Sequence, residues 1–218
     1  MNPVKIKTTV YLFSLLLLSC VQIKETQKII FDEHRLEISG FSEIQRHQLE
    51  RTIAQLKSLI PGPLEIKEVR YRRLSQFEHL FGFSFHGEPL SAWVLRRFSN
   101  ITYGNPWTVA VNQNKGTLII GDLFFTELSN LERLYLLVHE ARHSDKHGFK
   151  HSKCPEGFPF VSAGQPKQDL QGELACDKTP NGAYGYQAAF LFEIFAYGLF
   201  EQREAGLLYN SSISRIIQ

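Results

Sequence analysis

The stretch SNLERLYLLVHEARH, residues 129–143, decides how the rest of the chain is interpreted. It opens with Ser129 and Glu132 at the spacing of a capping box, in which the two side chains satisfy the first free amides of a helix. One helical face is then apolar, at Leu131, Leu134, Tyr135 and Val138. We expect a helix from residue 129 to about residue 147, ended by Gly148.

The end of this helix carries His139-Glu140-Ala141-Arg142-His143. His139 and His143 stand four residues apart, so both imidazoles project from one face and can bind a single ion. Glu140 lies about 100° around the helix, where it can reach a water on the metal without ligating the ion. A catalytic zinc needs three protein ligands and one open position, so a third ligand is expected elsewhere in the chain.

The motif resembles that of the zincin metallopeptidases. The resemblance implies that His139 and His143 bind one Zn²⁺ per chain. It implies that Glu140 is the general base, which takes a proton from the water on the zinc and passes it to the leaving amine. The implied fold is α+β and zincin-like: a small mixed sheet with a backing helix, the active-site helix and an apolar C-terminal helix. In zincins the substrate lies beside an edge strand, for which residues 117–125 are the candidate.

The third zinc ligand is ambiguous in the sequence. Gly148 and His151 form a Gly-x-x-His, like the metzincin turn, but four residues instead of two separate His143 from Gly148. The metzincin Met-turn is excluded because the only methionine is Met1. We favour His151, since a helix that ends at glycine can return the chain to its own histidine.

Three carboxylates are alternative ligands. Glu193 lies in the apolar segment 188–196, where a carboxylate needs a partner such as a metal or Arg142. Asp177 and Glu173 are further candidates.

The chain has three cysteines, Cys20, Cys154 and Cys176. In an oxidising compartment we expect Cys154 and Cys176 to form a disulfide. That bond would draw His151 and Asp177 together, so that one ligates the metal and the other orients a histidine.

The N-terminus predicts export. Lys5 and Lys7 precede an apolar run over residues 10–18 that is too short to span a bilayer. Leu17-Leu18-Ser19-Cys20 resembles the lipobox of bacterial lipoproteins, which implies that Cys20 is lipidated and becomes the new N-terminus. The residue after Cys20 is not Asp, which favours the outer membrane. A plain signal peptide cut elsewhere and an uncleaved anchor are the alternatives.

The charge balance argues against a nucleic-acid-binding protein. The chain has 24 basic and 22 acidic residues, a net charge of +2. Two of the basic residues lie in the first 19 positions, which hold no acidic residue, so the remainder is neutral. A nucleic-acid binder normally carries a basic excess that displaces counterions from phosphates.

The remaining patterns predict one domain. We expect a signal peptide over residues 1–19, a lipidated tether over 20–27, the zincin-like domain over 28–206 and a loose tail over 207–218. Ser42 and Gln45 form a second capping box, and a helix with Leu49, Ile53, Leu56 and Ile60 on one face follows it. Expected strands cover 29–38, 64–74 and 92–98, a hairpin joins 107–112 to 117–125, and an apolar helix covers about 184–204.

These observations predict a zinc-dependent hydrolase at the bacterial cell envelope, anchored to the membrane and cleaving peptide bonds in peptides or proteins. A cell-wall amidase with the same zinc chemistry is the alternative substrate class. A non-catalytic metal-binding lipoprotein is the third candidate, although a structural site has no need of a base at Glu140. Tyr184 and Tyr186 could stabilise an oxyanion, as in several zincins, but aromatic residues at a helix start more often serve packing, and neither is assigned to the site.

Overall fold

The computed structural model describes residues 27–31, 34–104, 109–114, 116–145, 149–157 and 170–217. The expected signal peptide, Cys20 and most of the tether lie outside these residues, so the predictions of export and lipidation stay predictions. His147 and Gly148 also lie outside the described residues. Among the helices of the described ranges, none is both long enough and apolar enough to cross a membrane.

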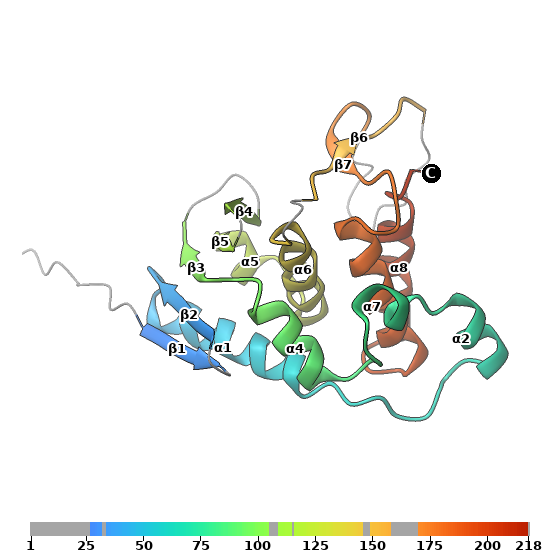
Figure 1. Cartoon of the computed structure of the whole chain (residues 1–218), viewed down its shortest axis with the longest axis horizontal. Coiled ribbons are helices and arrows are strands. Elements are labelled where there is room, and N and C mark those ends of the chain that lie inside the picture. Colours follow the sequence, from blue (N-terminus) through green and yellow to red (C-terminus); the bar gives the residue numbers. More distant parts are fainter. Residues whose placement is uncertain are drawn as a thin grey trace, which may run out of the picture.

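The described elements form runs of short strands separated by runs of helices (Figure 1). The strands are β1 Gln27–Phe31, β2 His34–Ser39, β3 Asn100–Tyr103, β4 Ala110–Asn114, β5 Thr117–Ile120, β6 Ser152–Lys153 and β7 Leu174–Cys176. The helices are α1 Glu43–Lys57, α2 Glu68–Leu74, α3 Phe77–Phe81, α4 Gly87–Leu95, α5 Asp122–Thr126, α6 Asn130–His143, α7 Ala183–Ala196 and α8 Gln202–Ile213.

The main sheet is small and mixed, as expected. Its strand order is β1-β2-β3-β5-β4. The β2–β3 and β3–β5 pairs are parallel, and the β1–β2 and β4–β5 pairs are antiparallel. The prediction of an α+β fold with a mixed sheet and a late hairpin is therefore confirmed. The candidate substrate strand is wrong, because β5 is paired on both sides and β4 is the edge strand next to it.

Both expected capping boxes are present. The backbone N–H of Gln45 donates to Ser42 Oγ over 3.3 Å, and the N–H of Ser42 donates back to the Gln45 side chain over 3.0 Å. The N–H of Ser129 likewise donates to Glu132 Oε2 over 2.7 Å. These local bonds begin α1 and α6 where the sequence predicts them.

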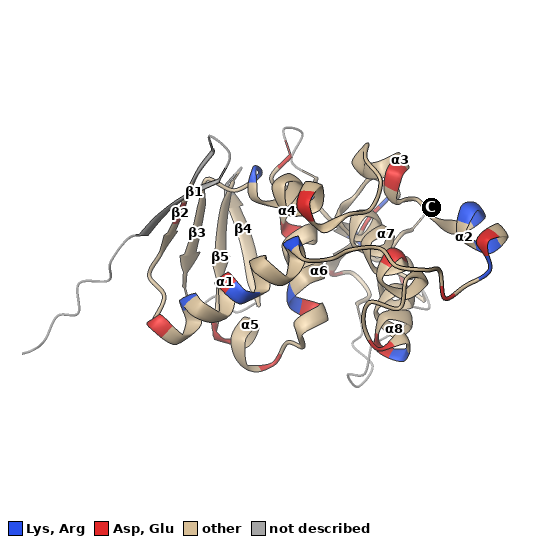
Figure 2. Cartoon of the chain, turned by 90° about the horizontal axis from the view of Figure 1, so that it is seen from below, with Lys and Arg blue, Asp and Glu red and all other residues tan. Residues whose placement is uncertain are grey.

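A single apolar core joins the sheet to the helices. The buried side chains of β2, β3 and β5 pack with those of α1, α4 and α6, and α7 closes the core from the other side of α6. Figure 2 shows the sheet at the left, with α6 between it and the α7–α8 pair. The helix with the two motif histidines is therefore enclosed on two sides, and this enclosure fixes its position.

Two segments expected as strands are wholly or largely helical. Residues 68–74, part of the expected strand 64–74, form α2, and residues 92–95 belong to α4. Short apolar runs do not distinguish a buried helix from a strand, so a long-range partner decides. For α4 that partner is α1: the N–H of Gly87 donates to Leu59 O over 2.7 Å, and a Cβ at Gly87 would collide with the backbone of α1.

The expected C-terminal helix is two helices. α7 ends at Ala196, and the chain turns through Gly198, whose φ of 61° favours glycine, before α8 begins. The loose tail expected over 207–218 is wrong, because α8 continues to Ile213 and buries Leu208 against the core.

The single strand expected over 29–38 is instead the antiparallel pair β1–β2.

Candidate metal centre

Helix α6 places two histidines and a glutamate at the boundary between the core and its surface. His139 and Glu140 are buried, with 6% of each residue exposed, and His143 is half-buried. The helix ends at His143 and not near residue 147 as expected, and Ser144 is the C-cap. The earlier end lets the chain turn back, so that Phe149 lies beside His143.

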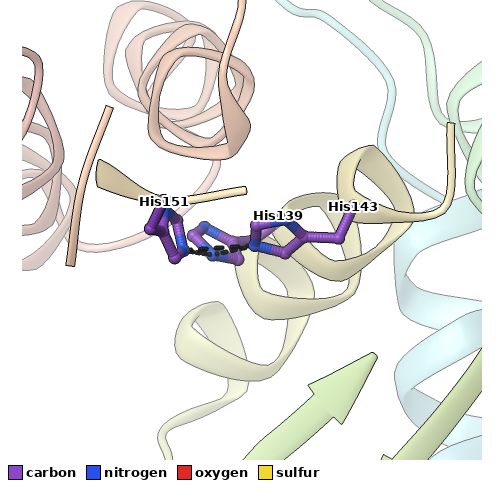
Figure 3. Close-up of side chains that lie close together, drawn as sticks. All are labelled: His139, His143 and His151. Carbon is purple, nitrogen blue, oxygen red and sulfur yellow. Dashed lines mark hydrogen bonds between the residues drawn. The ribbon is translucent and has the colours of Figure 1, made fainter. Parts of the chain in front are cut away.

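His151 joins the two helix histidines. It lies immediately before β6, and its Nε2 is 3.2 Å from Nε2 of His139 and 3.1 Å from Nε2 of His143. The two helix histidines are themselves 3.2 Å apart at Nε2. Figure 3 shows the three rings turned toward one common point. The preference for His151 over the acidic alternatives is thus supported by its position, and these three residues form a group that could hold a metal ion.

The other nitrogen of each ring points to an oxygen acceptor. His139 Nδ1 donates to Gln187 Oε1 over 2.8 Å, His151 Nδ1 donates to Asp177 Oδ1 over 2.8 Å, and His143 Nδ1 donates to the carbonyl oxygen of Phe149. Since each Nδ1 carries the hydrogen, each Nε2 presents a lone pair.

The orientation of the Gln187 amide follows from a further contact. Its Nε2 donates to Ser212 Oγ over 2.8 Å, and that hydroxyl donates its own hydrogen to Leu208 O. The amide oxygen of Gln187 is therefore the atom that faces His139, which settles the tautomer of this buried ring.

The three nitrogens fit a tetrahedral cation. Three lone pairs that face one another repel, and a cation among them removes that repulsion. A zinc ion with Zn–N distances of about 2.0–2.1 Å holds its nitrogen ligands about 3.3–3.4 Å apart. The observed separations of 3.1–3.2 Å are close to this spacing. The donor set of three neutral imidazoles suits zinc, although copper, iron and nickel also accept it.

The surroundings of the two helix histidines favour their neutral form. Burial, followed by the charges of His143 and His151, holds the pKa of His139 well below its ordinary value. Burial also lowers the pKa of His143. Near neutral pH these rings need lose no proton before they bind a metal.

Glu140 faces β4. Burial raises the pKa of its carboxyl to about 8, and hydrogen bonding from the backbone of Asn112 opposes this shift. The side chain of Asn112 also ties β4 to α6, because its Nδ2 donates to the carbonyl oxygen of Glu140 over 3.0 Å and to Ser144 Oγ. The sheet edge and the motif glutamate are thus held together.

A disulfide hairpin supplies the third histidine. Cys154 and Cys176 form the expected disulfide, with Cα atoms 5.1 Å apart, beside the antiparallel pair β6–β7. His151 lies three residues before the first cysteine, and Asp177 follows the second. The expectation that the disulfide draws these two residues together is confirmed by the hydrogen bond between them.

Asp177 orients His151 and is itself held by α7. Its second oxygen, Oδ2, accepts the backbone N–H of Tyr184 over 2.7 Å, in the first turn of that helix. The N-cap residue is Gly182, where a Cβ would overlap the Asp177 carboxylate. A negative charge near a helix N-terminus is stabilised there, so Asp177 has a fixed position from which to hold the ring.

The two remaining carboxylate candidates do not join the cluster. Glu193 is fully buried, but its oxygens accept the hydroxyls of Tyr71 (2.8 Å) and Ser75 (2.5 Å), which dock α2 on α7. Glu173 is exposed. The partner that Glu193 requires is thus a pair of hydroxyl groups and not a metal or Arg142.

Arg142, inside the motif, has a structural role. Its Nε donates to Asn181 O over 2.8 Å, and it forms an ion pair with Asp145, which also pairs with Arg97 over 2.7 Å. These bonds fasten the end of α6 to the chain that precedes α7. The pairing of Arg142 with Asp145 is one that the spacing of three residues permits.

Four residues at the site were not assigned from the sequence: Asn112, Tyr184, Gln187 and Arg215. Gln187 carries a usable signal, because a polar residue inside an apolar helix needs a hydrogen-bond partner. The ring of Tyr184 lies 4.7 Å from that of His139 and 4.8 Å from that of His151, centroid to centroid. For Asn112 and Arg215 no sequence pattern points to the site.

Comparison of the chain with protein-family models, with curated proteins and with solved structures finds no match in any of the three.

Proposed function

We propose that this protein is a zinc-dependent hydrolase of the zincin type that cleaves peptide bonds. The observation that carries the proposal is the arrangement of three Nε2 lone pairs 3.1–3.2 Å apart, with a buried glutamate next to the first of them. His139, His143 and His151 would hold the ion. A zinc ion there would acidify a water molecule and polarise the carbonyl group of the scissile bond.

Glu140 performs the proton transfers in this proposal. Burial raises the pKa of this carboxyl group toward the neutral range, and the positive charge of a bound zinc would favour the ionised form that acts as the base. It takes one proton from the attacking water and delivers it to the leaving amine nitrogen. Because Glu140 is buried, bulk water is kept from this proton. The backbone of Asn112 in β4 hydrogen-bonds to the carboxyl group, and the side chain of Asn112 holds the Glu140 carbonyl oxygen.

The sheet edge supports a peptide as the substrate. β4 is paired with β5 on one side, and within the described residues no strand pairs with its other side. An extended peptide can add to such an edge through backbone hydrogen bonds. The substrate would then pass directly beside Glu140. In this proposal β4 takes the substrate-binding role that was expected for residues 117–125.

A catalytic site is favoured over a structural one. Structural zinc sites are closed by four protein ligands. Across the described part of the chain, the group consists of His139, His143 and His151 alone, and the nearby Asp177 uses both oxygens on His151 and Tyr184. A fourth position therefore stays open for substrate. The proposed location, lipid-anchored at the bacterial cell envelope, rests on the N-terminal residues alone.

The test compares the wild type with Glu140→Gln. Zinc content is measured by mass spectrometry, and cleavage of a peptide mixture is followed by the same method. We expect one zinc per chain in both proteins and cleavage reduced at least about 100-fold in the variant, because a positioned base contributes about 10²–10⁴-fold. The matched control is Glu127→Gln, which changes an exposed glutamate. Equal cleavage by Glu140→Gln, or a wild type that takes up no zinc, would contradict the proposal.

A further inference from the structure

The C-terminal segment of the chain returns to the metal centre. After α8, the backbone N–H of Asp177 donates to Arg215 O over 2.8 Å, and the N–H of Ile217 donates to Asp177 O over 2.8 Å. The segment is thus bonded to the residue that orients His151.

Arg215 lies behind one ring of the site. Its Nη1 donates to the hydroxyl oxygen of Tyr184 over 2.6 Å, and its guanidinium carbon is 4.9 Å from the centre of that ring. The same ring contacts both His139 and His151. A single aromatic ring therefore separates the positive charge from two of the metal-binding imidazoles.

No carboxylate of the described residues forms an ion pair with Arg215, and Asp177 is occupied by His151 and Tyr184. A cation beside a metal site opposes metal binding unless an anion accompanies it. Asp177 supplies one negative charge beside the cluster, but its oxygens are bonded to His151 and Tyr184. Among the described residues the Arg215 guanidinium therefore has no anionic partner of its own, and its position suits a negatively charged ligand.

The guanidinium group has donors left for such a ligand. Only its Nη1 makes a side-chain hydrogen bond within the described residues. The Tyr184 hydroxyl accepts that bond, so its own hydrogen is free to point to the same ligand. A guanidinium fork matches the two oxygens of a carboxylate, and these charge-assisted bonds are among the strong ones.

We propose that Arg215 binds a substrate carboxylate on the residue that follows the scissile bond, and that the enzyme prefers peptides with a free C-terminal carboxylate there. This inference rests on the proposed function for the position of the scissile bond. The guanidinium carbon lies 4.9 Å from the centre of the Tyr184 ring, which lies 4.7–4.8 Å from the centres of the two imidazoles. One residue of extended chain spans about 3.3–3.6 Å, and its carboxylate adds a charge-assisted hydrogen bond of about 2.7–2.9 Å, so a single residue suits the passage around this one ring. The enzyme would then remove residues from the C-terminal end of peptides.

The test measures binding separately from turnover. In the zinc-loaded Glu140→Gln protein, calorimetry compares three acetylated alanine peptides: one with a free C-terminal carboxylate, its C-terminal amide, and an amide whose last residue is Glu. We expect the free acid to bind about 10-fold to 100-fold more tightly than the amide, the range for hydrogen bonds to charged groups. Tight binding of the Glu amide instead would assign the site to an acidic side chain and overturn the C-terminal preference.

The Arg215→Met substitution in the same protein should abolish the preference while zinc content stays at one per chain. Arg215→Lys, which keeps the charge without the fork, should restore part of it, and Arg203→Met on the exposed face of α8 should leave it unchanged. Equal binding of acid and amide, no binding of either, or a preference that survives Arg215→Met would each overturn the inference.

Failure of this inference is distinguishable from failure of the proposed function. Cleavage that depends on Glu140 but is equal for acid and amide would support the hydrolase proposal and contradict the role of Arg215. Binding that depends on Arg215 without any cleavage by the wild type would support the carboxylate site and contradict the hydrolase proposal.

Discussion

The two halves of the candidate metal centre are held in different ways. Helix α6 supplies His139, Glu140 and His143 from inside the main core, which packs around it on two sides. The hairpin β6–β7 supplies His151 and Asp177 from the residues next to its two strands. Among the described residues its own buried cluster contains Cys154, Leu170 and Cys176, with Ala175 and Ile217 against it. The first half is rigid because of its surroundings, whereas the second depends on one covalent bond and a few hydrogen bonds.

This difference teaches where metal affinity is vulnerable. A ligand on a packed helix is in place before the ion arrives, while a ligand on a small hairpin must be kept in place. Three sets of substitutions, ordered by the size of the expected effect, test the comparison.

Removing a helix ligand should have the largest effect. His139→Ala should abolish zinc binding measured by mass spectrometry after gel filtration, because one helix histidine then remains and Gln187 loses its partner. His151→Ala should retain weak binding through the two preorganised helix histidines, detectable only in excess zinc. His47→Ala, an exposed histidine of α1, is the control. The comparison fails if His139→Ala keeps zinc that His151→Ala loses.

Breaking the disulfide should weaken zinc binding without unfolding the core. The bond spans 22 residues, and a loop of about this length is worth about 3 kcal/mol in the chain-entropy account, or roughly 100-fold in affinity at most. A double variant, Cys154→Ser with Cys176→Ser, should therefore bind zinc about 10-fold to 100-fold less tightly in competition with a chelator.

Helix content by circular dichroism should be unchanged in this variant. Reduction of the wild type should reproduce the loss, since it breaks the same bond without changing a residue. Unaltered zinc affinity in both the double variant and the reduced wild type would mean that hydrogen bonds alone hold His151 and Asp177 in place.

Substituting Glu193, the candidate ligand that lies away from the three histidines, should have the smallest effect. Glu193→Gln should leave zinc affinity unchanged, because Glu193 bonds to Tyr71 and Ser75 and not to the cluster. The free energy of unfolding near neutral pH should change by no more than about 1 kcal/mol, since the amide oxygen can accept one of the two hydroxyl hydrogens and the amide nitrogen can donate to the oxygen of the other hydroxyl.

The pH dependence of stability should change in a definite direction. Burial raises the pKa of Glu193 above 4.5, so the folded protein holds this proton more tightly than the unfolded chain. The contribution of Glu193 to stability is present below pH 4.5 and is lost as the pH rises through the folded-state pKa. Relative to Glu193→Gln, the wild type should therefore lose stability above pH 4.5, as measured by urea unfolding. A constant difference between the two proteins across this range would contradict the assignment.

The sequence was most informative where the signal is local. The two capping boxes, the apolar stripe and the spacing of His139 and His143 are all properties of one helix, and a period of 3.6 residues places side chains without help from the rest of the fold. The disulfide followed from cysteine number and compartment, and its consequence for His151 and Asp177 followed from chain connectivity.

Other segments could not be assigned in this way. The alternation of Leu64, Ile66, Val69 and Tyr71 suggested a strand, but the hydroxyl groups of Tyr71 and Ser75 meet Glu193 when the segment coils, and that buried carboxylate is more than a hundred residues away. The segment with Ala92 became helical because Gly87 fits against the end of α1. Buried polar groups must find partners, and their partners depend on the tertiary packing.

The sequence by itself thus determined a helix that presents His139, Glu140 and His143, and it narrowed the third ligand to four residues. Only the tertiary structure selected His151, gave Glu193 its hydroxyl partners, placed β4 instead of β5 at the sheet edge and returned Arg215 to the site. The physical reason is the distance along the chain over which each interaction acts. Helix periodicity and capping act within one or two turns, whereas a ligand set, a sheet edge and an unpaired charge are defined by groups that lie far apart in the chain and meet only when the core is packed.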